Sequence, residues 1–275
     1  MNAKSPGTFI TELKDIARSA GQAITRIRAG GAEVEQKDDG SPVTEADKTS
    51  HRIICERLEV LSPSYPIISE EGNPEEVLSQ DTSRYWLVDP LDGTKEFVKG
   101  LPEYTVNIAL VEEGNPLLGV ILIPESGELY HAVRNKGAWK SEPGNSSARR
   151  INVKSSTDEL TAVISRSHSG EETKRLLDEL AVKNTKKRGS SLKICAVAEG
   201  DADIYVRPVP TYLWDTAAGT AILRQAGGMT AGLPERPYDP ANGLKLQRYA
   251  ACATEEQARR VDELLMQQRA GQPDG

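Results

Sequence analysis

The sequence is poor in cysteine, in aromatic residues and in positive charge, and each shortage excludes a class of protein. Its three cysteines, Cys55, Cys195 and Cys252, form no Cys-x-x-Cys pair, so neither a disulfide framework nor a zinc site is expected. Aromatic side chains make up 5% of the 275 residues, too few for an extended platform that stacks bases. The formal net charge of −7 disfavours binding of duplex DNA or RNA through a basic surface.

Long apolar runs are missing as well. No stretch approaches the roughly 20 apolar residues that a membrane helix needs. Residues 1–16 carry charged side chains and lack the apolar centre of a signal peptide. We therefore expect a cytoplasmic protein without a transmembrane segment. Peripheral contact with the inner membrane face stays open, although no basic amphipathic helix favours it. The sequence does not predict the oligomeric state.

Hydrophobic spacing predicts two helices and then a sheet in the first half of the chain. Apolar residues recur at helical spacing over residues 9–24, and a second helix begins at Thr44. Short apolar runs at 66–68 and 85–88 predict buried strands, and 106–111, 117–123 and 129–133 predict an antiparallel meander. Segments 30–41, 73–83 and 140–150 are rich in Gly, Pro, Ser or charge and are expected to be loops.

The second half alternates between strands and helices. Strands are predicted at 162–164, 204–206 and 250–253, and helices at 171–182, 192–198, 216–225 and after Thr254. The pattern predicts a layered α/β protein of two halves. Residues 1–145 form an α+β half with an antiparallel sheet and most candidate metal ligands, and residues 146–275 form an α/β half with Asp215 and the substrate-side residues.

Carboxylates fall at the ends of the predicted strands and at the start of a helix. Glu70 and Glu71 follow one strand, Asp89 and Asp92 follow the next, and Asp215 precedes a helix. Rigid elements position such side chains and bring them to one edge if the strands are neighbours. Clustered carboxylates cannot all stay ionised in a dry site without cations. Mg²⁺ prefers oxygen ligands and keeps waters for substrate phosphates, and Mn²⁺, which shares this preference, is not distinguished from it.

The segment 89–94, Asp-Pro-Leu-Asp-Gly-Thr, suits two adjacent ions. Pro90 fixes its φ angle and Gly93 permits a sharp turn, which can bring both carboxylates to one side and expose the Leu91 carbonyl. Two ions about 4 Å apart could hold the attacking and leaving oxygens of phosphoryl transfer. Thr94 offers a hydroxyl to orient the attacking water, and the N–H groups of Gly93 and Thr94 could hold phosphate oxygens.

Each acid taken alone also has an ordinary structural interpretation. An Asp-Gly pair is typical of a hairpin turn, Glu70 and Glu71 suit a solvated loop, and Asp215 suits a helix cap. These interpretations together require five acids to stand at element ends by accident, so the sequence favours the metal site.

The sequence resembles the Mg²⁺-dependent, lithium-sensitive inositol monophosphatase superfamily over residues 41–228. The resemblance is carried by 89–94 with its extension Lys-Glu-Phe at 95–97, by Trp-Asp-Thr-Ala-Ala-Gly at 214–219, and by Ser-Pro-Val-Thr-Glu-Ala-Asp at 41–47. Segments 95–97, 165–168 and 189–193 are similar to the bacterial 3′(2′),5′-bisphosphate nucleotidase branch, which is associated with sulfate assimilation. The implied fold is the α-β-α-β-α five-layer sandwich of the inositol monophosphatase and sugar phosphatase type.

The resemblance implies the ligands of the metal ions. Glu70, Asp89 and the Leu91 carbonyl would hold one Mg²⁺, and Asp89, Asp92 and Asp215 would hold a second. Glu70 could reach a third, weaker ion through water.

The resemblance also implies a nucleophile pair and a substrate side. Asp47 and Thr94 would orient and deprotonate the attacking water. The expected substrate contacts are Glu70, Leu91, Asp92, Gly93, Thr94, His168, Ser190, Lys193, Arg207 and Asp215. Lys193 is the first choice for a second phosphate and Arg207 the second. The alternatives are a solvated helix residue for Lys193, a surface cation for Arg207 and a loop residue for His168.

We expect a metal-dependent phosphomonoesterase that converts adenosine 3′,5′-bisphosphate to AMP and phosphate, with 3′-phosphoadenylylsulfate as a companion substrate. The alternative enzyme is an inositol monophosphatase or a sugar phosphatase of the fructose-1,6-bisphosphatase type. A sensor without turnover is disfavoured because Asp47 and Thr94 are both present. An exonuclease is disfavoured by the net charge.

Overall fold

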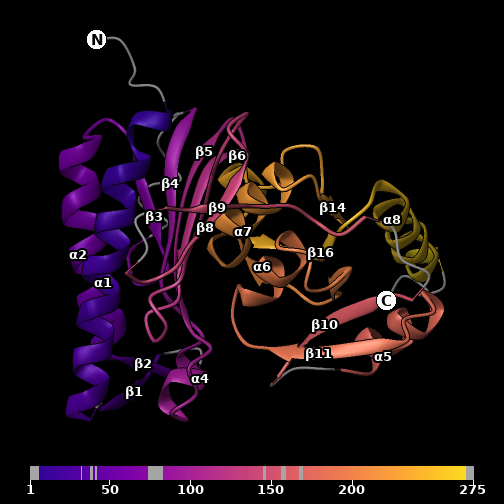
Figure 1. Ribbon diagram of the computed structural model, residues 1–275, viewed down its shortest axis with the longest axis horizontal. Coiled ribbons are helices and arrows are strands. Elements are labelled where there is room, and N and C mark those ends of the chain that lie inside the picture. Colours follow the sequence, from indigo (N-terminus) through magenta and orange to yellow (C-terminus); the bar gives the residue numbers. More distant parts are fainter. Residues whose placement is uncertain are drawn as a thin grey trace.

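The computed structural model describes residues 6–31, 33–37, 40, 42–73, 83–144, 147–155, 159–166 and 170–270. Its elements stack in alternating layers of helices and sheets (Figure 1). Helices α1 and α2 cover one face of a large sheet, and α6 and α7 lie between that sheet and a smaller one. Helices α5 and α8 cover the outer face of the smaller sheet. The predicted α-β-α-β-α sandwich is therefore confirmed.

The outer helices of the first layer are α1 (Ile10–Gly30) and α2 (Glu45–Leu61), both predicted from hydrophobic spacing. Thr44 caps α2, since its hydroxyl accepts a hydrogen bond from the Ala46 N–H at 3.1 Å. The Asp47 carboxylate in turn accepts the Thr44 N–H at 2.7 Å, which completes a capping box. The cap fixes where α2 begins and, with it, the position of Asp47.

The large sheet has seven strands in the order β3-β4-β5-β6-β7-β8-β9. Their bounds are Ile67–Ser69, Arg84–Asp92, Thr105–Glu112, Asn115–Leu122, Leu129–Val133, Ala138–Ser141 and Arg149–Ile151. Strand β3 runs parallel to β4, and the remaining neighbours are antiparallel. Helices cover both faces, so β4 to β7 are almost continuously buried and have no alternation of polar and apolar residues.

Two of the predicted loops contain strands. Segment 140–150 includes the end of β8 and most of β9, and segment 30–41 includes β1 (Val34–Gln36), which pairs with β2 (Pro42–Thr44). Strands β1 and β9 are short and largely exposed, so their polar and charged residues lack the apolar pattern of a buried strand. In segment 73–83, residues 74–82 lie outside the described residues.

The smaller sheet has five strands in the order β11-β10-β12-β16-β14. Their bounds are Asn184–Arg188, Thr161–Ser165, Ile204–Arg207, Tyr249–Cys252 and Met229–Ala231. The helices around it are α5 (Glu171–Glu179), α6 (Leu192–Ala198), α7 (Leu213–Gln225) and α8 (Glu255–Ala270). A separate pair joins β13 (Thr211–Tyr212) to β15 (Lys245–Leu246). Strand β11 was not predicted, because this exposed edge strand carries basic residues and lacks the apolar pattern of a buried strand.

The boundary predicted between residues 145 and 146 falls outside the described residues, and β9, just beyond it, belongs to the large sheet. The division into two halves stays a prediction.

Helix α7 approaches the large sheet closely at Gly119 of β6. A Cβ atom at Gly119 would lie 2.4 Å from the Ala218 carbonyl oxygen, inside van der Waals contact with the helix backbone. We expect Gly119→Ala to force these layers apart and to lower the free energy of unfolding by about 1 to 3 kcal/mol. Gly170→Ala is the matched control, because Gly170 has an extended backbone and open space around its Cβ position. Equal urea denaturation midpoints for the two variants would contradict this packing argument.

Candidate metal centre

Three acidic side chains from separate elements converge at one edge of the large sheet. Carboxylate oxygens of Glu70, Asp89 and Asp215 lie within 4.8 Å of one another. Glu70 follows β3, Asp89 lies near the end of the parallel neighbour β4, and Asp215 lies in the first turn of α7. Adjacent parallel strands end at the same edge, and α7 packs on this sheet, so the topology brings the acids together. The predicted convergence is confirmed for these three residues.

Asp92 stands beside this group on an irregular part of β4. Asp89 pairs with Asn107 of β5 and Asp92 with Thr105, with a register shift between the two pairs. Gly93 follows with φ at +96°, and the short helix α4 (Thr94–Val98) begins directly after it. The predicted sharp turn is therefore present.

The predicted nucleophile pair is in contact. The Thr94 hydroxyl donates to Asp47 Oδ1 at 3.0 Å, and Asp47 Oδ2 accepts the hydroxyl and the N–H of Thr44 at 2.6 and 2.7 Å. Asp47 is buried. The cap on α2 thus binds Oδ2 of Asp47, and Oδ1 binds the hydroxyl of Thr94, which directly follows the turn at Gly93.

Burial dominates the electrostatics of the acids. It raises the pKa of Glu70 to about 7 and the pKa of Asp92 to about 6. Burial and then the neighbouring charge of Glu70 raise the pKa of Asp89 well above its ordinary value, and burial also raises the pKa of Asp215. Ionising all four carboxyls is costly unless a cation is present. The donors are all oxygens, so the residues fit a hard divalent cation such as Mg²⁺ or Mn²⁺.

Lys37 is a contact that the sequence did not predict. Its Nζ lies 3.0 Å from Glu70 Oε1 and 2.5 Å from Glu71 Oε1. Lys37 follows β1, within the segment expected to be a loop. Its contact with Glu70 joins residues far apart in the sequence, so no local sequence pattern predicts it. Its ammonium group partly neutralises the carboxylates.

Two cations, the buried Lys193 and the half-buried Arg207, act on the acids. Lys193 of α6 is 6% exposed, which excludes a solvated helix residue, and its charge favours the carboxylate form of Asp92. Arg207 ends β12, and its charge favours the carboxylate form of Asp215. Arg207 Nε is buried and has no hydrogen-bond partner among the described residues. Both cations therefore act on the acids, and their role toward a second phosphate stays a prediction.

The remaining predicted substrate contacts are Ser190, the Leu91 carbonyl and His168, and the structure describes the first two. Ser190 lies close to Gly93, has φ at +45°, and has a buried hydroxyl without a hydrogen-bond partner in the described part of the chain. The Leu91 carbonyl accepts the Thr94 hydroxyl at 3.2 Å. His168 lies outside the described residues.

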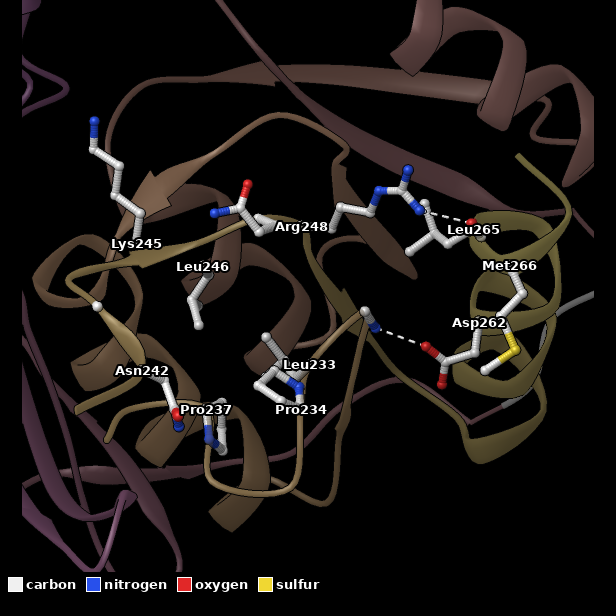
Figure 2. A pocket seen from close by; sticks show the side chains of 13 residues that line it. Leu233, Pro234, Pro237, Asn242, Lys245, Leu246, Arg248, Asp262, Leu265 and Met266 are labelled. Carbon is white, nitrogen blue, oxygen red and sulfur yellow. Dashed lines mark hydrogen bonds between the residues drawn. The ribbon is translucent and has the colours of Figure 1, made fainter. Parts of the chain in front are cut away.

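A pocket of about 380 Å³ lies elsewhere, between the segment 232–248 and α8 (Figure 2). None of the predicted site residues lines it. Arg248 donates to the Leu265 carbonyl at 2.6 Å, and Asp262 accepts the Gly232 N–H at 2.7 Å, so both charged groups are paired with backbone. The acidic edge, not this pocket, is the candidate site.

Comparisons with known proteins agree with this geometry. The model of the inositol monophosphatase family matches residues 7–271. The chain is 47% identical to the 3′(2′),5′-bisphosphate nucleotidase CysQ of Salmonella typhimurium over 80% of this chain and 88% of that protein. It is 44% identical to the protein of that name from Escherichia coli K12, over 84% of this chain and 93% of that one.

A solved structure, CysQ from Bacteroides thetaiotaomicron, superimposes with a TM-score of 0.74 at 36% identity, covering 88% of this chain and 96% of that chain. Its title describes a bacterial member of the inositol monophosphatase family. Separately, none of the helices in the described ranges combines the length and apolar character needed to cross a bilayer.

Removing one acid from the cluster should weaken metal binding and should raise the stability of the metal-free protein. In the metal-free protein, Asp89→Asn relieves repulsion, so we expect the variant to be more stable than the wild type in EDTA. Mg²⁺ about a hundredfold above its Kd should stabilise the wild type by about 2.7 kcal/mol and the variant far less. Thermal melts with and without Mg²⁺ measure both effects. Asp178→Asn on the exposed face of α5 is the control.

The advantage of Asp89→Asn in EDTA should depend on pH. Glu70 titrates near 4.5 when unperturbed and at about 7 in the fold, so the folded wild type binds protons more tightly than the unfolded chain. Stability that depends on these protons is lost as the pH rises through that interval. The difference between the variant and the wild type should therefore widen from pH 4.5 to pH 7. A constant difference, or equal stabilisation of both proteins by Mg²⁺, would contradict the assignment of Asp89.

Proposed function

This chain belongs to the inositol monophosphatase family, and we propose that it is a metal-dependent 3′(2′),5′-bisphosphate nucleotidase. The proposed reaction removes the 3′-phosphate of adenosine 3′,5′-bisphosphate and leaves AMP and phosphate. The observation that carries the proposal is the edge at which the acids, the pair Asp47 and Thr94, and the cations Lys193 and Arg207 meet. Relatives at 44–47% identity bear the name of this activity.

We propose that the acids hold Mg²⁺. Glu70, Asp89 and the Leu91 carbonyl would bind one ion, and Asp89, Asp92 and Asp215 a second, with a third reached by Glu70 through water. Bound divalent ions lower the pKa of the attacking water and neutralise charge on the phosphoryl group and the leaving oxygen. The raised pKa values of Glu70 and Asp92 support this role, because a cation returns both groups to the carboxylate form.

Asp47 and Thr94 would handle the proton of the attacking water. The single proton of the Thr94 hydroxyl points to two acceptors, Asp47 Oδ1 and the Leu91 carbonyl, so toward the attacking water the Thr94 oxygen can act only as an acceptor. A proton taken from that water passes through Thr94 to Asp47 Oδ1. Burial raises the pKa of Asp47, which makes its carboxylate a stronger base than an exposed aspartate.

Lys193 and Arg207 would bind the phosphate that is not cleaved. An adenosine bisphosphate carries two phosphates, and the acids with their ions take one of them. The other needs protein cations, and the buried Arg207 Nε without a partner in the described residues is a donor suited to an anion. Ser190, whose hydroxyl is also unpaired there, would contribute a further hydrogen bond.

The substrate range extends the proposal. We propose 3′-phosphoadenylylsulfate as a companion substrate and a role in sulfate assimilation, together with lithium inhibition. The same acids would serve an inositol monophosphatase or a sugar phosphatase, so substrate choice depends on the cations. The predicted cytoplasmic location, with peripheral contact to the inner membrane face left open, stays a prediction.

Replacing one buried lysine tests whether the cations favour a nucleotide bisphosphate over a monophosphate. Lys193→Met keeps the volume of the side chain and removes its charge. We expect the KM for adenosine 3′,5′-bisphosphate to rise about 10- to 100-fold, the usual effect of losing a charged hydrogen bond. The kcat for a monophosphate such as 3′-AMP should stay near the wild-type value. Phosphate release in Mg²⁺ measures both.

Lys187→Met is the matched control, because Lys187 is an exposed cation on β11, just before the segment 189–191 that leads to α6. Inositol 1-phosphate and fructose 1,6-bisphosphate complete the substrate panel. Faster turnover of either one than of adenosine 3′,5′-bisphosphate would replace the nucleotidase proposal with the alternative enzyme.

A further inference from the structure

Buried hydrogen bonds from two layers converge on Asp92. Its Oδ2 atom accepts the Ser191 N–H at 2.6 Å and the Asn107 side-chain amide at 3.4 Å. The Ser191 hydroxyl donates to Asn107 Oδ1 at 2.9 Å and lies 2.8 Å from the Thr105 hydroxyl. Thr105, Asn107 and Ser191 are each at most 3% exposed. A polar network this deeply buried is costly unless every member is paired.

The network has one direction. Ser191 has a single hydroxyl proton, and Asn107 Oδ1 accepts it, so Thr105 must donate to the Ser191 oxygen. This bond also orients the Asn107 amide, since the reversed amide would place its carbonyl oxygen against the Asp92 carboxylate. Donation therefore runs from Thr105 through Ser191 and Asn107 to Asp92.

The network lies at an irregularity in the pairing of β4 with β5. Asp89 pairs with Asn107 and Asp92 with Thr105, and the register shifts between these pairs. Ser191 precedes α6, which lies in the layer between the two sheets (Figure 1). Asp92 is thus fixed from its neighbouring strand and from the middle helical layer together.

We infer that Thr105, Asn107 and Ser191 are positioning residues for the metal-binding carboxylate of Asp92. The inference rests on the proposed function, in which Asp92 and Asp215 hold a divalent ion. Because both donors bind Oδ2, Oδ1 of Asp92 would be the oxygen available to hold a cation. Residues that hydrogen-bond to a ligand orient it, and their loss typically costs about 10- to 100-fold in metal affinity or activity.

The network also joins the two binding tasks of the site. Ser191 lies two residues before Lys193, the cation proposed for the second phosphate. The segment that would hold the substrate therefore also fixes a ligand of the metal.

The test measures metal binding directly, without substrate. Mn²⁺ is titrated into the metal-free protein, and the free ion is counted from its electron paramagnetic resonance signal. Ser191→Ala removes the central hydroxyl and keeps the backbone N–H on Asp92. Thr105→Val is the milder second variant, because it keeps the shape of the side chain. We expect both to weaken the binding of one Mn²⁺ ion, Ser191→Ala by about tenfold, and to leave the affinity of another unchanged.

Two further variants separate positioning from general stability. Ser62→Ala removes a buried hydroxyl that accepts the Trp86 indole N–H at 2.8 Å and is not a member of the network, so it should lower the melting temperature without changing Mn²⁺ affinity. Thr105→Ser keeps the first donor of the network and should restore the affinity lost in Thr105→Val.

The outcomes are distinct. Wild-type Mn²⁺ affinity in both Ser191→Ala and Thr105→Val overturns the inference, and so does an equal loss of affinity in Ser62→Ala. A wild-type titration with a single bound ion overturns it as well. Phosphate release by the wild type tests the proposed function separately, so unchanged affinities in an active enzyme refute the positioning role alone.

Discussion

Mutual repulsion among buried carboxylates is the constraint on which the rest of the molecule depends. The fold forces Glu70, Asp89 and Asp215 together at an edge where burial already disfavours their charged forms. Positive charge from Lys37 offsets part of this cost for Glu70, and Lys193 and Arg207 act in the same sense on the far side. These cations lower the free-energy cost of ionising the clustered carboxyl groups but do not remove it. A bound cation would complete the charge balance.

The layered architecture is what holds the acids against this repulsion. Helix α7 carries Asp215 and is almost wholly buried between the two sheets, so it cannot withdraw without opening the hydrophobic core that lies between them. Gly119 admits the backbone of α7 to β6, and Gly219 admits the side chain of Ile194 from α6. Close packing in the middle layer therefore converts the burial of apolar surface into a fixed geometry for charged groups.

Local chemistry explains which features could be predicted from the sequence. The cap at Thr44 and the turn at Gly93 depend on residues next to one another, and the buried strands show as uninterrupted apolar runs. The exposed strands β1, β9 and β11 were missed because polar edges lack that pattern. The contact of Lys37 with Glu70 and the network around Asn107 depend on tertiary pairing, which no spacing in the sequence encodes.

The acids alone cannot determine the substrate. Any phosphate monoester presents the same group to the metal ions, so discrimination must come from what surrounds them. In a chain of net charge −7, a second phosphate is tolerated only where cations are placed for it. Lys193 is buried and Arg207 is half-buried with a buried Nε atom, and both favour the carboxylate form of Asp215, where water screens charge less than at the surface. A substrate with two phosphates gains from this arrangement, whereas a monophosphate leaves the two cations without an anionic partner beyond the acids themselves.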